Sequence, residues 1–369
     1  MRASRIALLL PDLGGGWAER VAATLANAFV ERGHRVDLLL ARHQGVWLDQ
    51  LDPAVRVIDL EAPRLRQVVR PLTSYLRREQ PDGLLSFMWP LNIFAVLAGV
   101  LARSATRIVV TDHIALSQQY ASWGPIHRSV LKRSIAAFYP RAAARVVVSQ
   151  GARNDLASLA GLAIEALEVI HNPVPAPIPL PASTDRIDAL WGGPGPRTLT
   201  AGSLKSQKNH ALLIRSFASL PRSDARLMIL GEGALRAELA QLAMSLGILD
   251  RVVMPGFASD PWPYYASADL FVLSSDYEGF ANVVAEALQA GLPVVSTDCP
   301  HGPREILDGG RFGKLVPVGN VSSLADAIAA ALVETPDKER LKQRGACFGG
   351  HEAIARYEAL LLAPGRSTA

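Results

Sequence analysis

Cysteine is almost absent from this chain, which has only Cys299 and Cys347 among its 369 residues. Two cysteines cannot build the disulfide framework of a small secreted protein, so a reducing compartment is favoured. Neither cysteine lies at a spacing typical of metal ligands, and we expect both to be packing residues.

Long hydrophobic runs are also few. The N-terminal run is five residues long, and Pro11-Asp12 ends it without a small-residue cleavage site, so no signal peptide is expected. The exception is Leu84–Ala102, which carries no charge over 19 residues, about the length that crosses a bilayer. Pro90 and Asn92 interrupt it, and we therefore favour a strand, a turn and a buried helix over a membrane span. The helix is expected at Leu91–Ala102.

Negative charge is scarce in the first half of the chain. Residues 1–175 hold 20 Lys and Arg against 14 Asp and Glu, whereas the remainder holds 18 against 20. The basic excess lies mainly in two groups: Arg64, Arg66, Arg70, Arg77 and Arg78, and Arg128, Lys132, Arg133, Arg141 and Arg145. Scattered arginines on solvated helix faces are one interpretation. Attraction to an anionic membrane surface or acceptor is the one we favour. No nucleic acid is expected as a partner, because interleaved aromatics and binding motifs are lacking.

Short apolar runs alternate with helical patterns along the chain. In the first half, strands are expected in RIALLL, RVDLLLA, GLLSFM, RIVVTD and ARVVVSQ. After a proline-rich segment, HNPVPAPIPLP, strands are expected in RTLTAGSL, ARLMILGEG, RVVMPGF, DLFVLSS and LPVVSTD. Strands that alternate with helices indicate parallel sheets covered on both faces.

The α/β chain is therefore expected to form two Rossmann-like doubly wound domains, over residues 1–172 and 188–349. Proline at every second position from 173 to 181 favours an extended linker, which we place at 173–187. A final helical stretch at about 350–363 is expected to pack back on the first domain. Ligands of such sheets bind at the carboxyl ends of the strands, so the two domains are expected to face each other across a cleft.

The segment DYEGFANVVAEALQAGLPVVSTD, residues 276–298, places Glu278 and Glu286 eight positions apart. The pattern predicts a loop around Glu278 after a strand and a helix from about Ala281 to Ala290, ended by Gly291. Free N–H groups at the start of that helix suit a phosphate. The two glutamates lie in different elements. We interpret them as hydrogen-bond acceptors for hydroxyls at opposite ends of one ligand, rather than as a general acid and base.

The longer segment EGFANVVAEALQAGLPVVSTDCPHGPREIL closely resembles the signature of the retaining, GT-B-fold glycosyltransferases of family 4. The resemblance spans nearly the whole chain. It implies that Glu278 holds hydroxyls of a donor sugar and that Glu286 holds the ribose of its nucleotide. The residues that would approach the sugar and diphosphate are Gly279, Phe280, Ala281, Asn282 and Val283.

A second loop, AGSLKSQKNH at residues 201–210, carries Lys208, whose compact charge can neutralise a diphosphate leaving group. Members of the family usually have arginine where this chain has Ser203. The cationic clamp is weaker here unless Lys205 or another residue substitutes. The remaining donor-binding residues that we expect in the second half, outside the glutamate segment, are Gly202, Ser203, Asn209 and Phe257.

Two elements of the first half complete the resemblance. The turn LGGGWAER resembles the family's glycine-rich loop, and Gly15 and Gly16 would let the backbone approach a ligand closely. Trp17 replaces a small residue and is expected to shape access of the acceptor. His113 follows the strand RIVVTD, at a point comparable to the family's functional histidine. The expected catalytic residues are His113, Lys208 and Glu278.

No metal or other cofactor is expected. Asp276-x-Glu278 resembles the acidic metal motif of the other glycosyltransferase fold, but that fold has a single domain and places its motif before the last strands. Lys208 and the start of the helix are expected to take the place of a metal cation.

The sequence thus predicts a metal-independent, retaining hexosyltransferase (EC 2.4) at the cytoplasmic face of the membrane, with a peripheral contact through its basic domain. The expected donor is a nucleoside diphosphate sugar, with UDP favoured over GDP. The expected acceptor is a hydroxyl of a glycan or lipid-linked glycan in a bacterial lipopolysaccharide, capsule or exopolysaccharide. A nucleotide-sugar epimerase, a sugar phosphorylase and a non-catalytic nucleotide-sugar-binding subunit remain alternatives.

Overall fold

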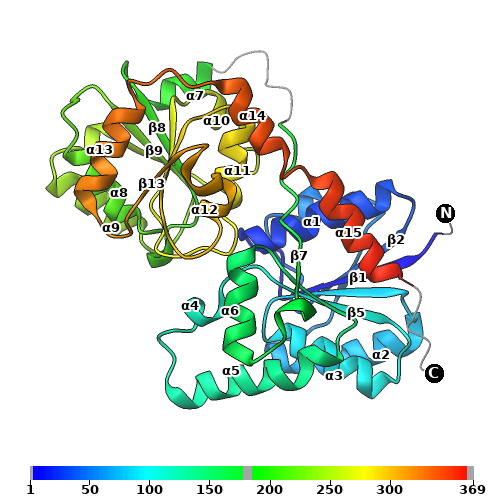
Figure 1. Cartoon of the computed structure of the whole chain (residues 1–369). Helices are drawn as coiled ribbons and strands as arrows, with labels where there is room; N and C mark the ends of the chain where they lie inside the picture. Colours follow the sequence, from blue (N-terminus) through cyan, green and yellow to red (C-terminus); the bar gives the residue numbers. More distant parts are fainter. Residues whose placement is uncertain (1–2, 178–184, 364–369) are drawn as a thin grey trace. The chain divides into compact units, whose positions relative to one another are not determined.

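The computed structural model describes residues 3–177 and 185–363, and the chain divides into two compact units (Figure 1). Unit 1 comprises the residues up to Pro173 together with those from Gly350 onward, and unit 2 runs from Val174 to Gly349. Each unit contains one parallel sheet with helices on its faces. The predicted α/β class with two Rossmann-like units is therefore confirmed.

Unit 1 is built on a seven-stranded sheet with the order β3-β2-β1-β4-β5-β6-β7. The strands are β1 (Arg5–Leu10), β2 (Arg35–Leu40), β3 (Arg56–Asp59), β4 (Gly83–Phe87), β5 (Arg107–Asp112), β6 (Ala144–Val147) and β7 (Glu168–Val169). The helices are α1 (Trp17–Glu31), α2 (Val69–Glu79), α3 (Leu91–Ala102), α4 (Leu116–Gln119), α5 (Pro125–Phe138), α6 (Gln150–Ala160) and α15 (Gly350–Leu362).

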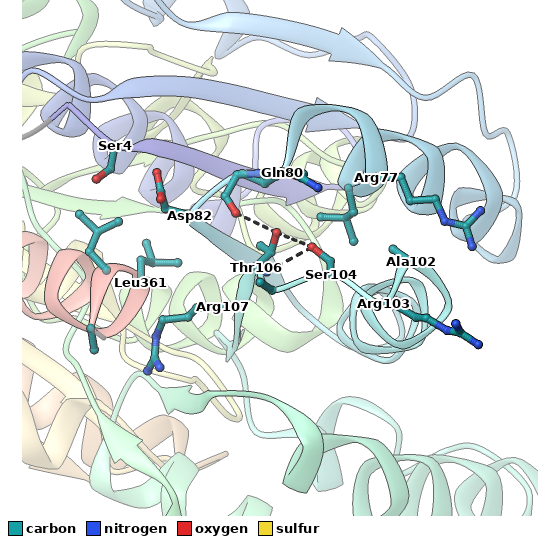
Figure 2. A pocket seen from close by; sticks show the side chains of 15 residues that line it. Ser4, Arg77, Gln80, Asp82, Ala102, Arg103, Ser104, Thr106, Arg107 and Leu361 are labelled. Carbon is teal, nitrogen blue, oxygen red and sulfur yellow. Dashed lines mark hydrogen bonds between the residues drawn. The ribbon is translucent and has the colours of Figure 1, made fainter. Parts of the chain in front are cut away.

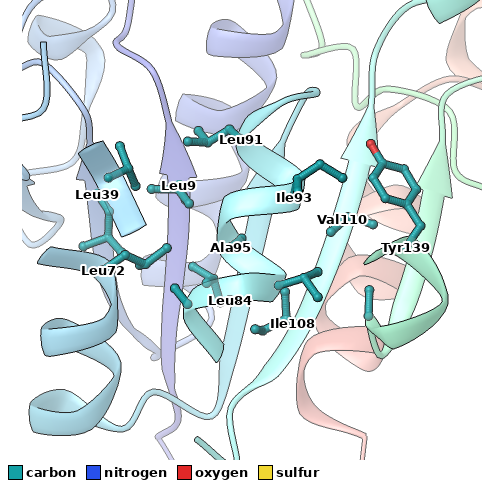
Figure 3. Close-up of a cluster of buried hydrophobic side chains, with 14 of the residues drawn as sticks. Leu9, Leu39, Leu72, Leu84, Leu91, Ile93, Ala95, Ile108, Val110 and Tyr139 are labelled. Carbon is teal, nitrogen blue, oxygen red and sulfur yellow. The ribbon is translucent and has the colours of Figure 1, made fainter. Parts of the chain in front are cut away.

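Alternate residues of the central strand β1 face opposite cores, which explains why it is apolar throughout. Ala7 and Leu9 belong to the core formed with α2, α3, α5 and α6, part of which is shown in Figure 3. Ile6 and Leu8 belong to the other core, formed with α1 and α15. A strand that is buried on both faces needs apolar side chains at every position, because successive side chains face opposite cores.

The uncharged stretch Leu84–Ala102 forms β4 and α3, so the predicted strand and buried helix are confirmed. Asn92 is fully buried, and its side-chain amide donates to the backbone oxygen of Thr111 at 3.1 Å. Over the described ranges, 3–177 and 185–363, no helix is long and apolar enough to cross a membrane.

Unit 2 has a six-stranded sheet with the order β10-β9-β8-β11-β12-β13. Its strands are β8 (Arg197–Ala201), β9 (Arg226–Leu230), β10 (Val252–Gly256), β11 (Leu270–Leu273), β12 (Val294–Thr297) and β13 (Lys314–Val316). Its helices are α7 (Asp185–Leu190), α8 (His210–Ala218), α9 (Arg236–Ser245), α10 (Trp262–Ala266), α11 (Asn282–Gln289), α12 (Pro303–Ile306), α13 (Val321–Ala331) and α14 (Lys338–Ala346). Helices α8, α9 and α13 share one core with the sheet, whereas α11 packs on β11, β12 and α14.

The segment expected to be a linker, 173–187, overlaps ordered elements at both of its ends. Val174 forms an isolated bridge with Gly349, and α7 begins at Asp185. Residues 178–184 of the expected linker lie outside the described residues. The expectation that both cysteines pack is wrong for Cys347, which is exposed, whereas Cys299 is buried.

The C-terminal helix α15 belongs to unit 1, where it packs against α1, β4 and β5. Leu361 of this helix is fully buried and lies directly over Gly83, where an added Cβ atom would come within 2.8 Å of the Leu361 Cβ. The absence of a side chain at Gly83 is what allows this close approach.

We expect Leu361→Ala to lower the free energy of unfolding of unit 1 by about 3 kcal/mol, because it leaves a cavity between α15 and the sheet. Urea denaturation followed by circular dichroism measures the change. Val100→Ala is the control, since Val100 is 59% exposed in the same unit. A loss as small as that of the control would show that α15 does not anchor on the sheet.

Candidate functional site

The order of the unit 2 sheet brings two loops of the sequence together. The order of strands reverses between β8 and β11, which are neighbours in the sheet. At such a point in a doubly wound sheet, the connections that leave the two adjacent strands run in opposite directions. This opens a crevice at the carboxyl ends of the strands. The loop after β8 carries residues 202–209, and the loop after β11 carries residues 274–281.

Lys208 and Glu278, from these two loops, form a buried ion pair. The Lys208 Nζ donates to the Glu278 Oε1 at 2.6 Å, and the two side chains are only 5% and 8% exposed. The Ser275 hydroxyl donates to the same carboxylate oxygen, also at 2.6 Å. A buried charge needs a partner and hydrogen bonds, and each of these two charges has both.

Further hydrogen bonds hold the two loops against each other. The Asn209 side-chain amide donates to Asp276 Oδ1 at 2.8 Å, and the Ser274 hydroxyl donates to the backbone oxygen of Lys208 at 2.9 Å. Asn209 also caps α8, because its side-chain oxygen accepts from the Leu212 N–H. The structure thus gives Asn209 a positioning role, and its predicted contact with a donor stays a prediction.

Glu286 lies on α11 and is completely buried. Its Oε2 accepts a hydrogen bond of 2.8 Å from the hydroxyl of Tyr265, on α10. The two glutamates are therefore held by different partners, and their predicted contacts with a ligand stay predictions.

The start of α11 is a sharp turn without a side-chain cap. Ala281, at the N-cap position, has a left-handed backbone with φ of 67°, and no side chain caps the helix. Gly302 packs so closely on this turn that an added Cβ atom would lie 2.5 Å from the Phe280 carbonyl oxygen. Left-handed alanine is uncommon outside functional sites and tight turns. Phe280, Ala281, Asn282 and Val283 are all buried around this turn.

The loop after β8 approaches Lys208 closely at Gly202. An added Cβ atom there would lie 3.1 Å from the Lys208 Cε, and the φ of Gly202 is 156°. Next to this loop, burial and the nearby Lys208 charge lower the pKa of His210 to about 4. His210 is therefore neutral at pH 7 and adds no charge to the loop. Ser203 is partly buried and Lys205 is exposed.

Phe257 and Gly279 also belong to unit 2. Gly279 lies in the loop between Glu278 and α11 and is buried. Phe257 follows β10, at the edge of the sheet, and its side chain is 42% exposed. Its predicted contact with the nucleotide stays a prediction.

The predicted residues of unit 1 lie at the carboxyl edge of its own sheet. Gly15 and Gly16 follow β1, and Gly16 is the N-cap residue of α1. His113 follows β5, and its ring stacks on Phe87 with 5.2 Å between ring centroids. Burial lowers the pKa of His113 to about 4, so the imidazole is neutral at pH 7. A neutral imidazole can donate one hydrogen bond and accept another.

Three residues of these sites were not among those predicted from the sequence: Asp112, Ser275 and Tyr265. Asp112 is 2% exposed, and burial raises its pKa to about 6, although the Tyr139 hydroxyl donates to it at 2.7 Å. Its place beside His113 at a strand end was a usable signal. Ser275 lies two positions after the end of β11 and three before Glu278, whereas Tyr265 carries no spacing signal toward Glu286.

One pocket of unit 1 lies apart from these sites. The pocket in Figure 2, of about 510 Å³, lies where β4 and β5 begin, at the opposite edge of the unit 1 sheet from His113. Asp82, Arg107 and Leu361 are among its lining residues. Within residues 3–177 and 185–363, no group of three His, Cys, Asp or Glu side chains could hold a metal ion.

Two family models match the chain. Residues 14–176 match the Glycosyltransferase Family 4 model, and residues 184–347 match the model of glycosyl transferases group 1. The N-acetylgalactosamine-N,N'-diacetylbacillosaminyl-diphospho-undecaprenol 4-alpha-N-acetylgalactosaminyltransferase of Campylobacter jejuni is 28% identical, over 92% of this chain and 93% of its own. The lipopolysaccharide core biosynthesis glycosyltransferase LpsE of Rhizobium meliloti is 26% identical, over 89% of each chain.

Solved structures share the fold over nearly the whole chain. Anabaena HepE in complex with UDP and glucose has a TM-score of 0.83 at 19% identity, covering 98% of this chain and 100% of that one. WaaG, a glycosyltransferase involved in lipopolysaccharide biosynthesis, has a TM-score of 0.74 at 18% identity, covering 97% and 100%.

We expect Lys208→Met to destabilise unit 2 by about 3 kcal/mol, because it leaves the Glu278 carboxylate buried without its cation. Adding Glu278→Gln to this variant should restore most of the loss, since the double variant buries no unpaired charge. Urea denaturation of the two single variants and the double variant measures the coupling. Additive losses would contradict a buried ion pair.

Proposed function

Because the chain belongs to the GT-B-fold glycosyltransferases of family 4, we propose that it is a retaining, metal-independent enzyme that uses a nucleoside diphosphate sugar. We place it in bacterial polysaccharide or lipopolysaccharide biosynthesis. The Rhizobium meliloti relative is named for lipopolysaccharide core biosynthesis, and the Campylobacter jejuni relative for a diphospho-undecaprenol-linked acceptor. UDP is the favoured nucleotide, which is also the one bound in Anabaena HepE.

The observation that carries the proposal is the buried Lys208–Glu278 pair beside the uncapped start of α11. A nucleoside diphosphate sugar has hydroxyls at both ends and negative charge between them. Glu278 and Glu286 supply acceptors for the hydroxyls, and Lys208 with the α11 N–H groups supplies positive charge for the diphosphate. When the diphosphate binds, the Lys208 cation gains a second anionic partner without leaving its buried position.

In the reaction, the bond between the anomeric carbon and the β-phosphate oxygen breaks, and the nucleoside diphosphate leaves with the bonding electrons. The acceptor hydroxyl oxygen forms the new bond to the same carbon, and its proton passes to the departing phosphate oxygen. Lys208 stabilises the charge that grows on the leaving group. His113, kept neutral by burial, is suited to hydrogen-bond the donor sugar.

The acceptor that we propose is a lipid-linked glycan, held at unit 1. The C. jejuni relative is named for a diphospho-undecaprenol acceptor. In unit 1, a groove of about 900 Å³ is lined by Arg66, Arg70, Arg77 and Arg78 and by no acidic side chain. On α5, Ile126 and Val130 are 76% and 55% exposed, and no acidic residue lies on this helix. Exposed cations beside exposed apolar side chains suit the surface of an anionic membrane.

The transferase proposal is tested by incubating the protein with UDP- and GDP-sugars and lipid-linked acceptors, and by measuring release of the free nucleotide. We expect sugar transfer with UDP release that EDTA does not reduce. Lys208→Ala should lower turnover about a hundredfold, because one stabilising charge on the leaving group is lost.

Lys342→Ala is the matched control for that variant, since Lys342 is an exposed lysine of the same unit. Turnover near that of the wild type in Lys208→Ala would remove Lys208 from the mechanism. Activity that EDTA abolishes and a divalent cation restores would refute metal independence. Sugar isomerisation without nucleotide release would favour the epimerase alternative.

Replacing the exposed Arg64, Arg66 and Arg70 by alanine should reduce flotation with anionic liposomes several-fold, because each cation near the surface contributes to attraction. The control replaces three exposed arginines of unit 2, Arg215, Arg311 and Arg340. Equal flotation of wild type and the first variant would discard the membrane contact through this region.

A further inference from the structure

Tyr265 is fully buried on α10, and it contacts the carboxylate that we assign to the ribose. Its hydroxyl donates to Glu286 Oε2 at 2.8 Å, and both side chains have no exposed surface. The Tyr265 ring packs against the rings of Trp262 and Phe271, with centroid distances of 5.7 and 5.8 Å. Because the ring cannot turn away in such a packed setting, the position of the hydroxyl is fixed.

A glutamate side chain has three rotatable bonds. Its conformational freedom is lost when the carboxylate is fixed on a ligand, and that loss opposes binding. A hydrogen bond to one carboxylate oxygen sets the plane of the group and therefore the direction of the other oxygen. Tyr265 does this from α10, so it need not occupy the face of α11 that we assign to the ligand. Side chains that are held before binding increase affinity, since less freedom is lost on binding.

We propose that Tyr265 is a positioning residue for the donor nucleotide: its hydroxyl holds Glu286 Oε2, so that Oε1 is directed at the ribose hydroxyls. This inference rests on the proposed function, because it takes the contact between Glu286 and the ribose from there. Tyr265 itself does not touch the nucleotide.

An analogous arrangement supports the inference at the other glutamate. The Ser275 hydroxyl donates to Glu278 Oε1 at 2.6 Å, again from outside the helix that follows. Each of the two carboxylates thus receives a buried hydroxyl donor from a neighbouring part of unit 2. At Glu278 the Lys208 cation donates to the same oxygen, whereas the tyrosine that donates to Glu286 carries no charge.

The test compares binding of UDP and of 2′,3′-dideoxy-UDP, by calorimetry, to the wild type and to Tyr265→Phe. GDP and its dideoxy analogue are run in parallel. We expect Tyr265→Phe to bind the ribonucleotide about tenfold more weakly, the scale of one hydrogen bond to a charged group. Binding of the dideoxy analogue should be unchanged, because it has no ribose hydroxyl for Glu286 to recognise. In turnover assays, KM for the donor should rise about tenfold while kcat changes less than twofold.

Tyr264→Phe is the matched control, because it removes a hydroxyl from the adjacent residue of the same helix. It should leave both affinities as they are in the wild type. A merely structural role of Tyr265 would weaken binding of the ribonucleotide and the dideoxy analogue equally, and that result would overturn the inference.

A second comparison covers the case in which Tyr265→Phe folds poorly, since that variant removes one hydrogen bond from a buried carboxylate. Glu286→Gln removes the charge, and the double variant Tyr265→Phe/Glu286→Gln should bind UDP as Glu286→Gln does. A further loss in the double variant would show that Tyr265 acts by another route.

If the wild type binds UDP and dideoxy-UDP equally, the ribose assignment of Glu286 fails together with this inference. If the wild type discriminates and Tyr265→Phe discriminates equally, only the inference fails.

Discussion

A buried ion pair between Lys208 and Glu278 is the interaction on which the candidate site of unit 2 depends. The two charges come from loops that follow adjacent strands, and neither charge is tolerated at this depth without the other. The pair therefore holds the loop after β8 against the loop after β11. It also keeps a cation ready beside the start of α11, because burial prevents Lys208 from turning out to solvent.

Around this pair, hydrogen-bond acceptors and donors follow the order of the parts of a nucleoside diphosphate sugar, the ligand that we propose. Glu278 and Glu286 accept hydrogen bonds, and the N–H groups of the α11 start lie between them along the chain. The left-handed Ala281 makes the sharp turn from the loop into the helix, and close packing by Gly302 holds that turn in place. Hydroxyls of Ser275 and Tyr265 fix the two carboxylates, so the binding groups are oriented before a ligand arrives.

Much of this arrangement is readable from the sequence, because it lies within short contiguous segments. The helix expected from Ala281 to Ala290 is α11, Asn282–Gln289, and the helix expected at Leu91–Ala102 is α3. Alternating apolar runs indicated parallel sheets, since strands that are covered on both faces cannot be amphipathic. The spacing of Glu278 and Glu286 is likewise a local feature, because only the end of the loop after β11 and the first turns of α11 separate the two residues.

Other features depend on residues that are distant in the chain. Lys208 meets Glu278 across 70 positions and Tyr265 meets Glu286 across 21, and no periodicity connects these pairs. Residue composition likewise does not reveal that Leu361 of the last helix packs over Gly83 in unit 1. The sequence by itself determined the elements, their turns and the chemical types at their ends, because these follow from local periodicity and backbone preference. Only the tertiary structure decided which strand ends are neighbours and which buried hydroxyl serves which carboxylate, because strand order and side-chain packing are settled by the whole unit together.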